Sequence, residues 1–294
     1  MNEEQRPVGL IGVGLLGAAV AQRLLGSGRQ VRGYDLREGQ LDALSAAGGT
    51  RCPSAAEVLG SCSAVVMCLP DGKVSANVLS ENAASLRRGR TIIDTTTGDP
   101  EEMIAIGETL RAKGVAYVEA TVAGSSSQVR SGDACLFVGG DGPAVRRVEE
   151  ILDAIASRRF HLGPVGSASR FKLVHNLVLG LNRAVLAEGL SFAAALGFEP
   201  VRVLEILEQT PAASAVMASK GGKMASGDHE PQARLSQHLK DVRLIIAAAE
   251  REGLQTPLSR AHERLLERAE ALGFGDADNS AVIEAYRKQA EDAG

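Results

Sequence analysis

The feature that most constrains this chain is a glycine loop near its start, Gly12-Val13-Gly14-Leu15-Leu16-Gly17. An apolar run over residues 8–11 precedes the loop and predicts a strand, and a helical pattern over residues 18–25 follows it. In this setting the first glycine permits a tight turn, the second lets a ligand approach the backbone, and the third lets helix and strand pack closely. The free N–H groups of the helix N-terminus favour a pyrophosphate, so we predict a dinucleotide site formed by Gly12, Gly14, Leu15, Leu16 and Gly17.

A carboxylate stands where the second strand is expected to end. Residues 30–34 predict that strand, and Asp35 follows them, roughly 20 residues beyond the glycine loop. A carboxylate at this point accepts hydrogen bonds from a ribose 2′-hydroxyl and repels a 2′-phosphate. Asp35 therefore favours NAD, while the nearby Arg37 could partly offset the repulsion and keeps NADP as the alternative.

Short apolar runs alternate with helical patterns through the first half of the chain. Further strands are expected at residues 64–69, 91–94, 115–119 and 134–138. Their continuous apolar character is typical of strands covered on both faces, so we predict an α/β fold with a Rossmann-type, doubly wound parallel sheet. Beyond residue 163 only helical patterns appear, beginning with a long one over residues 168–196. We expect an NAD(P)-binding domain over residues 1–163 and an all-helical substrate and dimerisation domain over residues 164–294, with the long helix between domains.

Composition narrows the class of function. The formal net charge is −4 and no basic tract is present, which excludes the electrostatic footprint of a nucleic-acid binder. The four cysteines have neither C-x-x-C spacing nor a histidine at a zinc-like offset, so we expect reduced thiols and no metal site. The N-terminus lacks the basic start and apolar core of a secretory signal, and we expect no apolar run long enough to span a bilayer. These features predict a cytoplasmic protein without a membrane partner.

The long helical pattern also bears on assembly. Its apolar content is more than one buried face of a helix needs. We therefore expect a homo-oligomer, either a homodimer or a homotetramer.

Five segments are spread over nearly the whole chain: the glycine loop, Leu69-Pro70, Asp94-Thr95-Thr96-Thr97-Gly98-Asp99-Pro100, Glu119-Ala120-Thr121-Val122-Ala123-Gly124-Ser125, and Lys172-Leu173-Val174-His175-Asn176. Together and in this order they resemble the β-hydroxyacid dehydrogenase family, typified by 3-hydroxyisobutyrate dehydrogenase and tartronate semialdehyde reductase. The pair Lys240-Asp241 is also similar to a family segment.

The resemblance implies an oxidoreductase that moves a hydride between a nicotinamide cofactor and a small 3-hydroxy acid or its semialdehyde. It implies that Lys172 is the catalytic acid/base, with Asn176 beside it. It implies a substrate loop formed by Val122, Ala123, Gly124 and Ser125. The further residues that it implies for the cofactor are Leu69, Pro70, Thr97 and Lys240.

Lysine suits the proton step of such a reaction. Hydride transfer from an alcohol needs a partner for the hydroxyl proton, and the protein supplies it while the cofactor supplies the redox chemistry. A lysine whose pKa falls toward neutrality through burial can take that proton. His175 and Asn176 follow Lys172 by three and four residues and can share its helix face. A solvated lysine at a helix end is the structural alternative.

Two departures from the family fall on substrate-facing positions. Ala123 stands where the family has serine, and Ser125, in the run Ser125-Ser126-Ser127, stands where it has glycine. The run supplies either a relocated hydroxyl or a flexible loop. His175 replaces the first of two paired asparagines and is either a second proton relay or a structural histidine.

Two other functions stay open on the sequence. One is an imine reductase-like enzyme of the same architecture, which would lack the catalytic lysine. The other is a cofactor-binding protein that has lost catalysis and acts in regulation.

Overall fold

The computed structural model describes residues 6–287, so five of the N-terminal residues considered for a signal sequence lie outside it. The chain divides into two compact units, Met1–Lys172 and Leu173–Gly294. We call them the sheet unit and the helical unit and describe each by itself.

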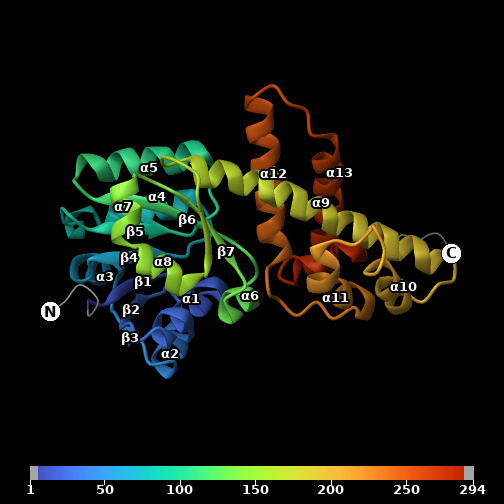
Figure 1. The fold of residues 1–294 in the computed structure, drawn as a ribbon, viewed down its shortest axis with the longest axis horizontal. Helices are drawn as coiled ribbons and strands as arrows, with labels where there is room; N and C mark the ends of the chain where they lie inside the picture. Colours follow the sequence, from blue (N-terminus) through green and yellow to red (C-terminus); the bar gives the residue numbers. More distant parts are fainter. Residues whose placement is uncertain (1–5, 288–294) are drawn as a thin grey trace. The chain divides into compact units, whose positions relative to one another are not determined.

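The sheet unit contains an eight-stranded sheet with the order β3-β2-β1-β4-β5-β6-β7-β8 (Figure 1). Its strands are β1 Val8–Ile11, β2 Val31–Tyr34, β3 Thr50–Arg51, β4 Ala64–Met67, β5 Thr91–Asp94, β6 Ala116–Ala123, β7 Cys135–Gly139 and β8 Arg158–His161. Neighbouring strands are parallel except for the antiparallel pair β6 and β7. The strand order reverses at β1, as in a doubly wound fold, and the predicted Rossmann-type architecture is confirmed.

Two strands were not expected from the sequence, and both lie at edges of the sheet. Strand β3 has only two residues and both are exposed. Strand β8 reads Arg-Arg-Phe-His and buries none of its residues fully. Neither carries the continuous apolar run by which a doubly covered strand is recognised.

Helices cover both faces of the sheet. They are α1 Leu15–Gly26, α2 Glu38–Ala46, α3 Ala55–Ser61, α4 Gly72–Glu81, α5 Pro100–Ala112, α6 Ser126–Ser131, α7 Gly142–Arg147 and α8 Glu149–Ile155, with a 3-10 turn at Ala83–Ser85. Successive residues of a strand point to opposite faces. Accordingly Val66 packs in the cluster that contains Leu24 of α1, whereas Val65 packs in the cluster that contains Met103 of α5.

The helical unit is built around α9 Ser167–Ala195, which begins in the sheet unit and runs for 29 residues (Figure 1). The other helices are α10 Pro200–Leu207, α11 Gly222–Ser226, α12 Leu235–Arg251 and α13 Pro257–Ala269, with π turns at Met217–Gly221 and Glu270–Phe274 and a 3-10 turn at Asn279–Ile283. Leu190 of α9, Leu239 of α12 and Leu266 of α13 share its core. The predicted long helix and helical second half are confirmed, and the β-pairing between residues 173 and 287 is one isolated bridge.

Helix α9 corrects one expectation. By length and composition it is apolar enough to cross a membrane, with a mean hydropathy of 1.4 over an 18-residue window. A single helix of this kind is weak support for a membrane span, because core helices pass the same test. Asn176 and Arg183 are buried polar residues of α9, and residues of this helix belong to the core of the helical unit.

Candidate active site

The glycine loop has the geometry that its sequence predicts. Gly12 has a φ of +90°, and a Cβ there would lie 2.3 Å from the Cys68 carbonyl oxygen. A Cβ on Gly17 would lie 1.9 Å from the Gly12 carbonyl oxygen. Gly14 is the N-cap of α1, whose first turn contains Leu15 and Leu16 and no acidic residue. The loop therefore presents helix N–H groups to an anion, and its close approaches exclude side chains at Gly12 and Gly17.

Asp35 is hydrogen-bonded directly to the glycine loop. Its Oδ2 accepts a hydrogen bond from the Val13 N–H at 2.8 Å, and its Oδ1 accepts one from the Arg37 N–H at 2.9 Å. The Arg37 Nε also lies 3.3 Å from Oδ1. A Cβ on Gly14 would meet the Arg37 guanidinium at 3.5 Å, so both charged groups lie beside the loop.

The segments after β4 and β5 meet at the same edge of the sheet as the loop. Strand β4 lies between β1 and β5, and all three are parallel, so their carboxyl ends coincide. The Leu69 N–H donates to Thr96 Oγ1 at 3.3 Å, which ties the Leu69-Pro70 segment to the segment that contains Thr97. Ligands of doubly wound sheets bind at this edge, where the strand order reverses. The glycine cradle, Asp35 and this edge fit a dinucleotide.

Lys172 is buried against the strand that leads into the predicted substrate loop. Only 7% of the residue is exposed, and its Nζ donates to the Val122 carbonyl oxygen at 2.6 Å. The structure thus brings together two predicted site residues that are 50 positions apart. A solvated lysine at a helix end, the alternative left open by the sequence, is wrong.

Glu119, on the same strand, holds the turn that leads into α9. Its Oε2 accepts a hydrogen bond from the Gly166 N–H at 2.5 Å, one residue before the helix begins. Burial raises the pKa of Glu119, although hydrogen bonds from Ser169 and Gly166 oppose the shift. Strand β6 is therefore joined to the start of α9 by Glu119 and by the contact between Val122 and Lys172. Sequence reasoning named Glu119 only as part of a motif.

The serine run begins a helix. Strand β6 ends at Ala123, Gly124 follows with a φ of +151°, and Ser125 is the N-cap of α6. Ser125 Oγ accepts a hydrogen bond from the Gln128 N–H at 3.3 Å, and Gln128 Oε1 accepts one from the Ser125 N–H at 2.8 Å. The flexible loop considered from the sequence is therefore wrong, because the serine run forms a reciprocal capping box at the start of α6. This capping box engages the Ser125 hydroxyl.

In the helical unit, Asn176, Lys240 and His175, which the sequence analysis singled out, belong to one network with Asp241. Asn176 is buried in α9, and its Nδ2 donates to Asp241 Oδ2 at 2.9 Å. Lys240 Nζ lies 3.1 Å from Asp241 Oδ1, and His175 Nδ1 lies 3.1 Å from Asn176 Oδ1. Asp241 joins Lys240 to Asn176, a role that sequence reasoning missed. The only signal in the sequence was the resemblance of the pair Lys240-Asp241 to a family segment.

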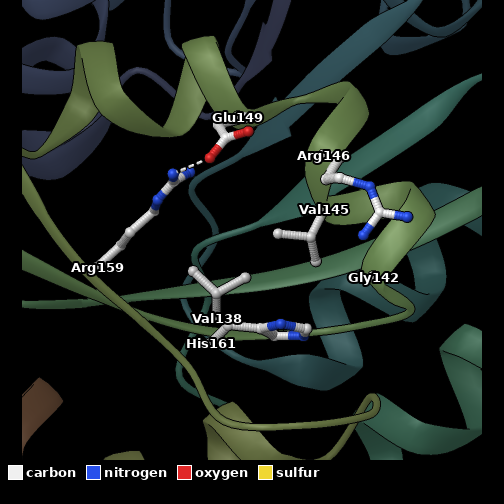
Figure 2. A pocket seen from close by; sticks show the side chains of 7 residues that line it. All are labelled: Val138, Gly142, Val145, Arg146, Glu149, Arg159 and His161. Atoms are coloured by element: carbon white, nitrogen blue, oxygen red, sulfur yellow. Dashed lines mark hydrogen bonds and ion pairs between the residues drawn. The ribbon is translucent and has the colours of Figure 1, made fainter.

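A surface depression elsewhere in the sheet unit lacks comparable chemistry. Its lining is Val138, Gly142, Val145, Arg146, Glu149, Arg159 and His161 (Figure 2). Figure 2 shows Arg159 turned toward Glu149, with which it forms an ion pair. Val138 lies on β7, which is four strands away from β1 in the sheet order, so the depression is separated from the glycine loop that follows β1. Within residues 6–287, no group of three or more His, Cys, Asp or Glu side chains could hold a metal ion.

Comparisons with known proteins place this geometry in a family. Residues 7–163 match the NAD binding domain of 6-phosphogluconate dehydrogenase. Residues 166–286 match the family described as NAD-binding of NADP-dependent 3-hydroxyisobutyrate dehydrogenase. Glyoxylate/succinic semialdehyde reductase 1 of Arabidopsis thaliana is 30% identical over 95% of this chain and 98% of its own length. The chain belongs to the β-hydroxyacid dehydrogenase family.

The two matched family models also show the NAD(P) cofactor, and two further matches support the family assignment. L-threonate dehydrogenase of Cupriavidus necator is 28% identical over 96% of this chain and 96% of its own length. The crystal structure of 3-hydroxyisobutyrate dehydrogenase from Salmonella typhimurium superposes with a TM-score of 0.89 at 25% identity, over 95% of this chain and 99% of its own. An imine reductase from Pseudomonas sp. gives a TM-score of 0.57 at 20% identity and shares the fold alone. The predicted dehydrogenase class is confirmed, and the imine reductase alternative is distant.

Proposed function

We propose that this β-hydroxyacid dehydrogenase transfers a hydride between NAD(P) and a small 3-hydroxy acid or its semialdehyde, with Lys172 as the acid/base. The observation that carries the proposal is the burial of Lys172 against Val122, at the entrance to the substrate loop. Relatives named as a semialdehyde reductase and as a dehydrogenase of a hydroxy acid support the substrate class.

The chemistry follows from what the side chains can do. The nicotinamide, when bound, accepts or donates the hydride. Lys172 is oriented by the Val122 carbonyl oxygen. In oxidation its neutral amine takes the substrate hydroxyl proton, and in reduction its ammonium returns that proton and stabilises the developing alkoxide. Asn176, one helical turn further along α9, contributes a second polar group on the same helix face.

The substrate loop holds the substrate mainly through its backbone. We assign this role to Val122, Ala123, Gly124 and Ser125. Ala123 has no polar side-chain atom, and the Ser125 hydroxyl oxygen already accepts a hydrogen bond as the cap of α6. Because Ala123 lacks the hydroxyl of the family's serine, we assign its part to backbone N–H groups such as that of Gly124.

The cofactor site is assigned in the same way. The pyrophosphate binds at Gly12, Gly14, Leu15, Leu16 and Gly17. Asp35 favours NAD over NADP, and Arg37 limits that preference because its guanidinium is paired with the same carboxylate. The nicotinamide half is contacted by Leu69, Pro70, Thr97 and Lys240. Residues 1–163 then form the cofactor domain, and residues 164–294 form the substrate and dimerisation domain.

The outer face of α9 supports an oligomer. Large apolar side chains are exposed along it at spacings of three, four and seven residues, which keeps them on one face. They are Phe171, Val174, Val178, Val185 and Phe192. Such a stripe suits a second copy of the chain, so we propose a homodimer or homotetramer.

The four cysteines of the protein are free thiols, which suits a cytoplasmic location.

A kinetic screen tests the function. Purified protein is assayed with NAD and with NADP against a panel of 3-hydroxy acids and sugar acids, and reduced cofactor is followed. Lys172→Ala is expected to lower kcat by about 10²- to 10⁴-fold, the usual contribution of a general acid/base. Lys113→Ala, at an exposed position that follows α5, is the control and keeps full activity.

Three outcomes distinguish the proposed dehydrogenase mechanism from its alternatives. Undiminished turnover in Lys172→Ala would contradict the assigned proton step. Tight cofactor binding without turnover on any substrate would favour the regulatory alternative. A parallel assay supplies cyclic imines with NADH or NADPH, and turnover there without turnover of hydroxy acids would favour the imine reductase alternative.

A further inference from the structure

Asp241 constrains how the amide of Asn176 can be oriented. The two residues are 6% and 8% exposed, and their hydrogen bond of 2.9 Å joins α9 to α12. Asp241 also lies in an ion pair with Lys240, and the oxygens of a carboxylate can only accept hydrogen bonds. Asn176 must therefore turn its NH2 group toward Asp241, and its carbonyl oxygen must point the other way.

The orientation of Asn176 in turn constrains His175. Asn176 Oδ1 lies 3.1 Å from His175 Nδ1. An amide oxygen can only accept, so the proton of this hydrogen bond must reside on Nδ1. While the imidazole is neutral, Nε2 then carries a lone pair and can only accept.

We propose that Asp241 is a positioning residue that acts through Asn176 to hold His175 in the tautomer protonated at Nδ1. The proposal rests on the proposed function insofar as Asn176 serves catalysis. The proposal also says what changes when histidine replaces the family's asparagine at position 175, because an asparagine offers both donors and an acceptor. A neutral ring in this tautomer offers only an acceptor at Nε2, three residues beyond Lys172 on α9.

The tautomer can be measured without turnover. The protein is labelled with ¹⁵N-histidine, and two-bond ¹H–¹⁵N correlations are recorded above about pH 8, where an unperturbed histidine is neutral. The chain has five histidines, and the signals of His175 are identified by their loss in His175→Gln. We expect a protonated Nδ1 and an unprotonated Nε2. A proton on Nε2 in the wild-type protein would overturn the proposal.

Three variants test the part played by Asp241. Asp241→Leu removes the acceptor, and Asp241→Asn keeps the shape but lets both amides pair in either orientation. Both are expected to give mixed tautomers at His175, and Asp241→Asn keeps the test valid if Asp241→Leu does not fold. Asp276→Asn makes the same change at a side chain that is 92% exposed and leaves the signals unchanged. An unchanged single tautomer in Asp241→Asn would contradict the proposal.

A kinetic readout separates positioning from substrate binding. The Asp241 variants are expected to lower kcat by about 10- to 100-fold, as small misplacements of a catalytic group do, and to change substrate KM less than threefold. A rise in KM at constant kcat would contradict a positioning role. If no substrate is ever found, the proposed function fails while the tautomer measurement still decides the fate of this inference.

Discussion

The sheet unit and the helical unit hold their proposed functional groups by different means. In the sheet unit the cofactor site depends on backbone geometry over a short stretch, where Gly12 and Gly17 leave no room for a side chain. In the helical unit, Asn176 is held by a side-chain hydrogen bond to Asp241, 65 positions away, and the buried ion pair of Lys220 and Asp278 likewise joins residues 58 positions apart. Substitutions that add side-chain volume should therefore disrupt the cofactor site of the sheet unit, whereas substitutions that remove a charge should disrupt the helical unit.

The largest effect is expected at the buried ion pair of the helical unit. Both oxygens of Asp278 lie 2.8 Å from Lys220 Nζ, and Asp278 also accepts hydrogen bonds from the N–H groups of Gln232, Ala233 and Ser280. Asp278→Ala leaves a buried ammonium unpaired, which costs about 3–5 kcal/mol in the free energy of unfolding. Urea unfolding, followed by circular dichroism, measures that loss.

The neighbouring Asp276 gives the matched control for that prediction. Its side chain is 92% exposed and lies 3.6 Å from Arg234. Asp276→Ala is expected to change the free energy of unfolding by less than about 0.5 kcal/mol. Equal losses of unfolding free energy in Asp278→Ala and Asp276→Ala would show that burial of the ion pair does not determine its contribution to stability.

The second prediction concerns the glycine loop. Gly17→Ala puts a methyl group against the Gly12 carbonyl oxygen and must move the loop or the helix. We expect the Kd for NAD to rise about 100-fold, or about 2.7 kcal/mol, in isothermal titration calorimetry. Gly26→Ala is the control in the same helix, since a Cβ there meets nothing within 4 Å. It should leave the Kd unchanged and slightly raise stability because alanine favours helix.

The third prediction concerns cofactor choice. Asp35→Asn keeps an oxygen to accept the Val13 N–H but removes the charge that repels a 2′-phosphate. The ratio of kcat/KM for NAD to that for NADP should fall about tenfold, equivalent to about 1.4 kcal/mol. Arg37→Ala removes the cation beside the same carboxylate and should move the ratio the opposite way. An unmoved ratio in both variants would mean that neither residue contacts the ribose.

The contrast between the units also explains which features the sequence could predict. The glycine loop, Asp35 and the strands of the sheet's interior are local patterns, so residues such as Gly12 and Gly17 could be assigned from spacing alone. The contact between Lys172 and Val122 followed from motif order, and its geometry needed the fold. No local pattern predicts that Asp241 reaches Asn176, because chain topology alone brings α12 to α9. The capping box between Ser125 and Gln128 was not predicted, although the two residues have the spacing of that motif.

The smallest expected effect is a difference in the response to pH. Burial raises the pKa of Asp94, although hydrogen bonds from Thr96 and Tyr117 oppose the shift. The folded sheet unit therefore binds a proton more tightly than the unfolded chain, and stability falls as pH rises from about 3.9, the unfolded value, through the raised pKa. At Asp278 burial also acts upward, but Lys220 and backbone donors lower the pKa overall, so stability is lost as pH falls below about 3.9.

Substitution of each carboxyl group by its amide separates the two responses. In the wild-type protein the free energy of unfolding should decline as pH rises above 4, by about 1.4 kcal/mol for each tenfold difference in the proton affinity of Asp94 between the folded and unfolded states. Asp94→Asn should remove this decline, and urea unfolding from pH 4 upward measures it. Asp278→Asn should leave that decline in place and abolish the loss on the acid side. If Asp94→Asn instead steepens the decline above pH 4, Asp94 is ionised in the folded protein, and the two units would bury their carboxylates alike.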